Sequence, residues 1–313
     1  MTLSVRAMLI AVAMAWAPLA IDARAQSPGG IPSSTLDLSG QDNGKPVNIE
    51  AENGVEWQQA NRVYIARGNA KVTRGQTTVT ADTLYAYYRP ATAPSAAARG
   101  AAPAQSQSMF DSGSTQIYRL EADGNVVFAT PTQTAHGDHA VYDMDQAVMV
   151  LTGKNLKILT PQDTVTARDS FEWYDQKQIG VARGDALAIR HGPAPKSIRG
   201  DILIAEISKP ENQPSKISKV DAHGRVVLTS QDEIAHGDAA VYNLDTGIAT
   251  LTGHVSLTRG DNQLRGQYGI VDTNNNVARL LSAPPSAQLT GPRPRVEGLL
   301  IPHPQDQPAK TKP

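Results

Sequence analysis

The sequence predicts an all-β protein, an elongated antiparallel sheet built from repeated two-strand units. Residues 135–153 (AHGDHAVYDMDQAVMVLTG) recur as residues 235–253 (AHGDAAVYNLDTGIATLTG), and a self-similarity this long marks a duplicated structural unit. Short segments rich in Val, Ile, Thr and Tyr alternate with Gly and Asn, which is typical of strands joined by tight turns. The residues are 40% hydrophobic but only 5% aromatic, which favours a β protein with polar turns over a dense helical one.

The N-terminus has the pattern of a secretory signal peptide over residues 1–25. Arg6 supplies a basic start, residues 7–20 form a short apolar run, and residues 23–25 (ARA) fit a cleavage site. The run is shorter than the ~20 apolar residues of a membrane span, so we expect cleavage and export. An uncleaved anchor is the alternative. Residues 26–46 are rich in Ser, Gly, Pro and Asp and predict a flexible N-terminal segment.

The predicted sheet occupies residues 47–291 and contains a disordered insertion at 89–116. That insertion is rich in Ala, Pro, Ser and Gln and has little to bury; a domain linker is the less favoured alternative, because the same strand pattern resumes after it. A smaller Pro/Asn/Ser-rich patch at 208–216 is a second expected insertion. Residues 292–313 predict a Pro-rich flexible tail, in which residues 299–301 (LLI) are a candidate final strand.

The interior face of the sheet is predicted from a glycine with apolar residues at even spacing, as in Ala122-Gly124-Val126-Phe128. Period two places such a set on one face of a strand, and the intervening positions, for example Asn125 and Arg225, should face solvent. The unit at 151–157 departs from the pattern, and a β-bulge after Gly153 would explain the change. Because the sets recur, we expect the units to stack in register around a continuous apolar interior.

Hairpin turns are predicted at residues 142–147 and 242–247, which favours antiparallel pairing over a parallel β-helix. Asp143 and Asp145 fall in the first turn, where Asp commonly bonds the local backbone.

No constellation of residues favours an enzyme. His136 and His139 suggest a metal site, but they are three positions apart, on opposite faces of a regular strand, and the second copy has Ala239. The sequence contains no phosphate loop, no HExxH motif and no cysteine. We therefore predict a non-enzymatic protein with no catalytic residue, metal or cofactor. The formal net charge of −1 gives no reason to expect nucleic acid.

The interior stripe has two interpretations, an ordinary packed core or a groove with room for acyl chains, and the pattern alone does not distinguish them. Each methylene buried in a groove contributes about 0.8 kcal/mol. The predicted lining residues, all at inward positions, are Val72, Val126, Phe128, Tyr142, Leu151, Val226, Leu228, Tyr242, Leu251, Val255 and Leu257. A sugar-stacking platform is a weaker alternative for the aromatic residues, which are spread over different units and are interpreted as packing residues: Trp57, Trp173, Tyr85, Tyr87 and Tyr88.

Three sets of short motifs resemble the OstA-like, or LptA, family of lipopolysaccharide-export proteins. They are Ala-x-Gly-Asn-Ala/Val at 66–70 and 122–126, VMVLTG at 148–153, and residues 262–282, and the resemblance covers roughly 48–290. It implies a twisted jelly roll open at both ends, a periplasmic location, and a groove that carries the lipid A acyl chains of lipopolysaccharide. It also implies end-to-end self-association, an LptC-like inner-membrane partner and an LptD-like outer-membrane partner.

Two other functions remain open. An LptC-like or LptD N-terminal-like module of the same pathway shares the fold; the cleavable signal argues against the first, and the missing membrane barrel against the second. From a different class, a β-solenoid surface-polysaccharide enzyme or adhesin predicts a parallel coil, so the sheet topology distinguishes it.

Overall fold

The computed structural model describes residues 47–90, 115–208, 216–275, 277–285 and 295–301. The expected signal peptide and N-terminal segment lie outside these ranges, as do most of the two expected insertions and of the tail. Eighteen strands form one sheet, and the described residues add one short 3₁₀ turn, η2 (Asp175–Lys177). The strands are β1 (Val47–Glu50), β2 (Val55–Gln58), β3 (Val63–Arg74), β4 (Thr77–Pro90), β5 (Thr115–Ala129), β6 (Thr134–Asp143), β7 (Val148–Thr152), β8 (Leu156–Leu159), β9 (Asp163–Ala167), β10 (Ser170–Tyr174), β11 (Ile179–Arg190), β12 (Lys196–Ser208), β13 (Lys216–Thr229), β14 (Ile234–Asn243), β15 (Ile248–Arg259), β16 (Asn262–Asp272), β17 (Val277–Leu281) and β18 (Glu297–Leu299).

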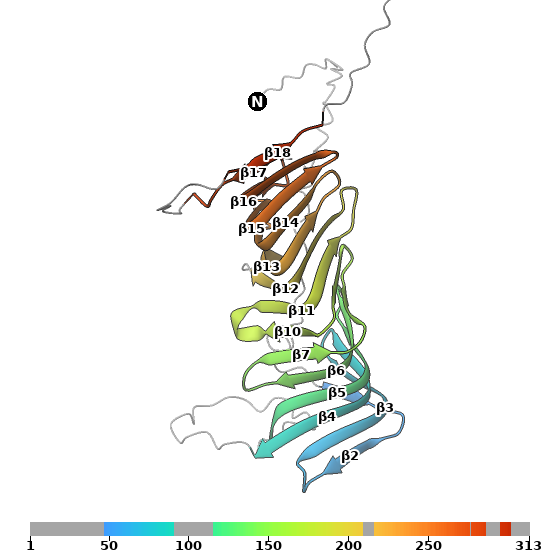
Figure 1. The fold of residues 1–313 in the computed structure, drawn as a ribbon. Coiled ribbons are helices and arrows are strands. Elements are labelled where there is room, and N and C mark those ends of the chain that lie inside the picture. The colour runs from blue at the N-terminus through green and yellow to red at the C-terminus, as the bar shows by residue number, and fades with distance from the viewer. Residues whose placement is uncertain (1–46, 91–114, 209–215, 276, 286–294, 302–313) are drawn as a thin grey trace, which may run out of the picture. The chain divides into compact units, whose positions relative to one another are not determined.

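Long strands that follow one another in the chain also lie side by side in the sheet (Figure 1). Strands β3 to β6 pair in succession, as do β10 to β16. Every pairing among the described strands is antiparallel, including those of the shorter strands. The all-β antiparallel class predicted from the sequence is therefore confirmed, and a parallel solenoid is excluded.

The sheet is divided into two halves, which we call its arms. At four positions across the sheet (its rungs), two short strands, one in each arm, stand in place of one long strand. Strands β1 and β2 both pair with β3, β7 and β8 with β6, β9 and β10 with β11, and β17 and β18 with β16. On its other edge, β7 pairs with β10, whereas β8 pairs with β9. Buried residues from both arms form one hydrophobic cluster, so the arms enclose a common interior.

A β-bulge marks the bend of each long rung. Gly124 and Asn125 of β5 have positive φ angles of 77° and 47° and lie together opposite Asp82 of β4. A Cβ atom on Gly124 would overlap the Asp82 carboxylate, so glycine is required both by the backbone angle and by the close approach. The same arrangement joins further pairs along the sheet: Gly184 with Asp169, Gly224 with Asp201, and Gly253 with Asp238.

The bulge predicted after Gly153 is present and contains an additional residue. Residues 137–138 of β6 lie opposite residues 153–156, whereas the equivalent residues 237–238 of β14 lie opposite 253–255. Leu156 is consequently buried and Lys157 exposed.

The expectation that His136 and His139 lie on opposite faces was wrong. Asp138 lies opposite a bulge, which reverses the alternation between them, so both alternate with the inward residues Ala135 and Ala140 and both face outward. His139 Nδ1 lies 2.5 Å from Asp123 Oδ1 on the neighbouring strand.

The strands extend beyond the predicted boundaries at two places. Strand β4 continues to Pro90 and β5 begins at Thr115, both inside the expected insertion 89–116. Strand β18 lies inside the expected tail and pairs with β16, and it includes Leu299 of the candidate final strand. The sheet therefore continues past residue 291.

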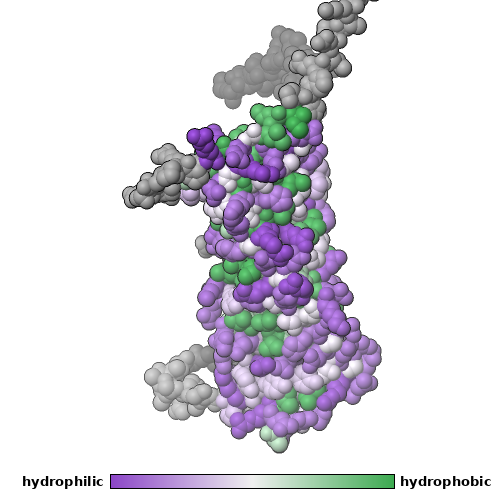
Figure 2. All heavy atoms as spheres, viewed as in Figure 1, coloured by the Kyte–Doolittle hydropathy of each residue, from purple (hydrophilic) through white to green (hydrophobic). Residues whose placement is uncertain are grey.

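The surface view shows polar residues with scattered apolar ones between them (Figure 2). Exposed apolar side chains occur on strands at the two ends of the sheet, with Val55 and Trp57 on β2 and Leu299 on β18. No helix among the described residues has the length and apolarity that a membrane crossing requires.

Candidate functional site

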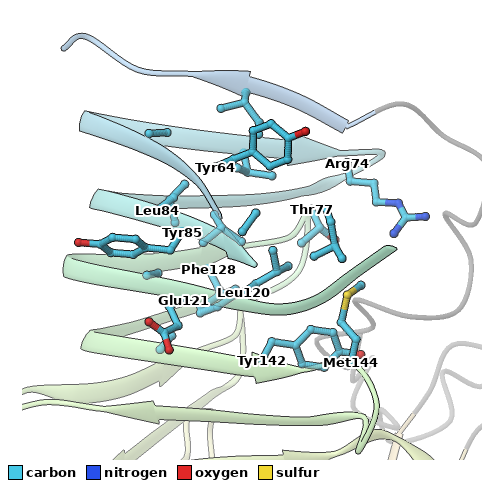
Figure 3. A pocket seen from close by; sticks show the side chains of 18 of the residues that line it. Tyr64, Arg74, Thr77, Leu84, Tyr85, Leu120, Glu121, Phe128, Tyr142 and Met144 are labelled. Carbon is cyan, nitrogen blue, oxygen red and sulfur yellow. The ribbon is translucent and has the colours of Figure 1, made fainter. Parts of the chain in front are cut away.

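An apolar cavity of about 190 Å³ lies between the two arms of strands β1 to β6. Figure 3 shows its lining, with Tyr64 at one end and Tyr142 at the other. Within the described residues, no side chain from β7 onward lines it. The apolar lining residues are Ile49, Val55, Ala66, Val72, Val79, Leu84, Ala86, Ile117, Leu120, Ala122, Phe128, Ala140 and Met144.

The bulges determine which residues reach the cavity. In β5, Ala122 precedes the bulge and Phe128 follows it, so one strand contributes to both arms. In β4, the single residue Asp82 opposes the bulge and shifts the inward alternation from Val79 to Leu84. Where the lining residues are alanines, their short side chains leave the centre of the cavity open.

Polar groups of the cavity lie at its edges. Arg74 and Met144 occupy one edge and Tyr85 and Glu121 the opposite one (Figure 3). Glu121 forms an ion pair with Arg119 and accepts a hydrogen bond from the Tyr87 hydroxyl at 3.2 Å. Burial, and then the neighbouring Glu121 carboxylate, raise the pKa of Tyr87, so its hydroxyl stays protonated at neutral pH. The centre of the cavity suits an apolar ligand, and its edges suit polar groups.

An aromatic cluster closes the cavity on the β2 side. The Trp57 ring stacks on Tyr64, with centroids 5.7 Å apart, and the centroids of Tyr64 and Tyr88 are 5.1 Å apart. Trp57 Nε1 donates a hydrogen bond to the Tyr88 hydroxyl at 2.8 Å, although the Trp57 residue is 55% exposed. Two residues that were expected to be spread over separate units, Trp57 and Tyr88, are therefore in contact.

The other predicted aromatic residues lie elsewhere. The rings of Tyr85 and Tyr87 stack on each other at 6.4 Å, and Trp173 is buried in the core. The interpretation as a packing residue is supported for Trp173, because its ring is buried.

The predicted groove residues divide into two groups. Val72, Phe128 and Tyr142 line the cavity. The remaining eight pack against or within the hydrophobic cluster without lining this cavity: Val126, Leu151, Val226, Leu228, Tyr242, Leu251, Val255 and Leu257. Leu228 also borders a smaller cavity of about 170 Å³, whose other lining residues are mainly polar. All eleven side chains face the interior of the sheet, and their contact with lipid stays a prediction.

Several cavity residues were missed by sequence reasoning, among them Leu84, Leu120 and Ile49. In β4 the available signal was the apolar series Val79-Ala81 and Leu84-Ala86, which changes alternation across Asp82.

The residues considered for other chemistry have structural partners. Asp143 Oδ1 accepts a hydrogen bond from the Gln146 backbone N–H at 2.9 Å, as expected for a turn residue, and Asp145 pairs with Arg89. The part of the chain that the structure describes contains no group of three His, Asp or Glu side chains arranged to hold a metal ion.

Comparison with protein families gives two tandem matches. The family described as "LptA/(LptD N-terminal domain) LPS transport protein" matches residues 48–178 and again residues 169–277. Among solved structures, one of those found is LptH from Pseudomonas aeruginosa, described as the LptA homologous periplasmic component of the lipopolysaccharide transport device. It is 21% identical, with a TM-score of 0.37, over 45% of this chain and 95% of that one. No curated protein matches the chain.

Proposed function

Because the chain belongs to the LptA/LptD N-terminal domain family of lipopolysaccharide transport proteins, we propose that its apolar cavity binds the acyl chains of lipopolysaccharide. The observation that carries the proposal is an open cavity lined by inward apolar side chains of β1 to β6. Burying five methylenes of an acyl chain there would contribute about 4 kcal/mol. The polar edges, with Arg74 and Glu121, leave the sugar headgroup in contact with water.

The proposed role is non-enzymatic transport as part of a periplasmic bridge from the inner to the outer membrane. The partners would be an LptC-like protein at the inner membrane, an LptD-like protein at the outer membrane, and further copies of the chain joined end to end. The first and last strands support such contacts, since an end strand offers backbone groups to an added strand and carries exposed apolar residues such as Trp57 and Leu299. An exported location requires that the signal pattern in residues 1–25 is functional.

A photocrosslinking residue in place of Phe128 tests the binding proposal. Phe128 points into the cavity, and the adjacent Val127 faces outward and is the matched control. With the chain expressed in its host, we expect lipopolysaccharide to be captured at position 128 and not at position 127. Equal capture at both positions, or capture at position 127 alone, would contradict binding in the cavity.

The family description also covers LptD N-terminal domains, so such a module is the alternative within the family. Depleting the chain in its host separates transport from an unrelated role. Loss of lipopolysaccharide from the outer membrane is the expected result, and an unaltered envelope would contradict any role in this pathway.

A further inference from the structure

The cavity ends at one row of three side chains. Tyr142 of β6, Met149 of β7 and Trp173 of β10 are register partners in sequence across the sheet, and all three are buried. Tyr142 lines the cavity, where it forms the end opposite Tyr64 (Figure 3), but Met149 and Trp173 do not. This row is therefore the boundary between the open cavity and the packed core.

A buried carboxylate holds the two aromatic residues of this row. Asp175, only 7% exposed, accepts a hydrogen bond from the Tyr142 hydroxyl at 3.2 Å on Oδ2 and one from Trp173 Nε1 at 2.7 Å on Oδ1. A buried carboxylate is costly unless its oxygens are bonded, so this arrangement favours one fixed position for both rings. The Trp173 ring also packs against Gly180, where an added Cβ would lie 3.4 Å from it.

In the second copy of the repeat, a hydroxyl group occupies the position of the Asp175 carboxylate. The Tyr242 hydroxyl lies 3.2 Å from Thr273 Oγ1, and the Thr273 backbone N–H donates to the Gly247 carbonyl. The Asp175 backbone N–H donates in the same way to the Ala147 carbonyl, so Thr273 takes the place of Asp175. A neutral hydroxyl is sufficient there, which makes Asp175 a feature particular to the first copy.

Asp175 and Trp173 also lie at a special place in the chain. Both fall within residues 169–178, the segment shared by the two family matches. The row of Tyr142, Met149 and Trp173 therefore lies at the junction of the two tandem units, with the cavity on one side and the packed core on the other.

We propose that Asp175 is a positioning residue that holds Tyr142, together with Trp173 in the same row, so that Tyr142 forms the end wall of the cavity, and that this wall sets the length of acyl chain the cavity accepts. The inference rests on the proposed binding of acyl chains. It adds a determinant of ligand length at the junction between the units.

The test measures the affinity of the purified exported chain for a series of saturated fatty acids of increasing length. For the unaltered chain, affinity should rise about fourfold with each added methylene until the ligand reaches the wall, and then level off. In Tyr142→Ala and Asp175→Ala, the levelling-off should move to longer ligands. The matched variants Tyr242→Ala and Thr273→Ala should leave it unchanged.

The outcomes separate this inference from the proposed function. If no fatty acid binds the unaltered chain, acyl-chain binding itself is wrong. If the unaltered chain binds and the folded variants level off at the same length, the wall is wrong, and an equal shift in Tyr242→Ala would also contradict it. Asp175→Asn, which changes no volume, keeps the test decisive if the alanine variants do not fold, because it should give a smaller shift in the same direction.

Discussion

The two family units of this chain, residues 48–178 and 169–277, share their motifs but differ in their interiors. The first unit holds the open apolar cavity, whereas in the second unit Ala222 is fully buried and Leu228 borders a cavity of about 170 Å³ whose lining is mainly polar. Both units have the same Gly–Asp bulges at their bends. The repeated pattern therefore determines which way side chains point, and the space between the arms depends on how each unit is closed.

The largest expected effect concerns the packed interior. Leu251 is fully buried, whereas Leu84 borders the cavity of the first unit. Replacing Leu251 with Ala should lower the free energy of unfolding toward the upper end of the ~2–5 kcal/mol range for such changes, because it creates a new void. Leu84→Ala only enlarges an existing space and should fall at the lower end. Denaturant unfolding of both variants measures this, and equal losses would contradict the difference in packing.

The bends should respond equally in both units. Gly124→Ala and Gly224→Ala each introduce a Cβ at positive φ that overlaps an Asp carboxylate, so each should cost about 2 kcal/mol or more of unfolding free energy. Gly260 also has a positive φ but has no neighbour within 4 Å of an added Cβ. Gly260→Ala is therefore the control for the backbone cost alone. A cost in the bulges no larger than in Gly260→Ala would show that the carboxylate contact is unimportant.

Filling the interior with a larger side chain should affect the two units differently. Ala222→Leu overfills a packed position and should destabilise the chain by about 1–3 kcal/mol. Ala122→Leu places its side chain in the cavity, so it should cost less stability but weaken fatty acid binding. Thermal unfolding and ligand titration on the same samples test both. Unchanged binding in a folded Ala122→Leu variant would place the ligand elsewhere.

The smallest effect concerns the acid stability of the junction. Burial raises the pKa of Glu172, but hydrogen bonds from Arg183, Tyr174 and Ser170 outweigh it and hold this pKa below its ordinary value of 4.5. Its contribution to stability is therefore complete above about pH 4.5 and is lost as the pH falls through the lowered folded-state pKa. Glu172→Gln should flatten the loss of stability over that acidic range. An identical pH profile for the variant would show that Glu172 contributes nothing.

Much of the fold follows from local rules that the sequence displays. The even spacing around Gly124 or Gly253 requires an inward face, and the irregular spacing after Gly153 indicates a bulge. The error about His136 and His139 came from treating β6 as a regular strand, when Asp138 lies opposite a bulge. Avoiding this error required knowing that Asp138 faces Gly153 of the neighbouring strand, as Asp82 faces Gly124.

The location of the cavity was beyond the sequence pattern. The cavity depends on side-chain contacts that reach across an intervening strand, such as Trp57 with Tyr88 across β3 and Tyr142 with Asp175 across β7. These contacts depend on the register of strands far apart in the chain, whereas the alternation of apolar residues is nearly the same in both units. Eight of the predicted groove residues consequently do not line the cavity, although they face the same interior.

The central claim is that acyl chains occupy the first unit and not the second. Phe128 and Leu228 hold equivalent positions in the two units, since each follows the bulge of its strand by the same number of residues. Photocrosslinking from position 128 and from position 228 in otherwise identical chains compares the two interiors directly. We predict capture of lipopolysaccharide from position 128 and little from position 228; equal capture from both, or capture from position 228 alone, would contradict the account.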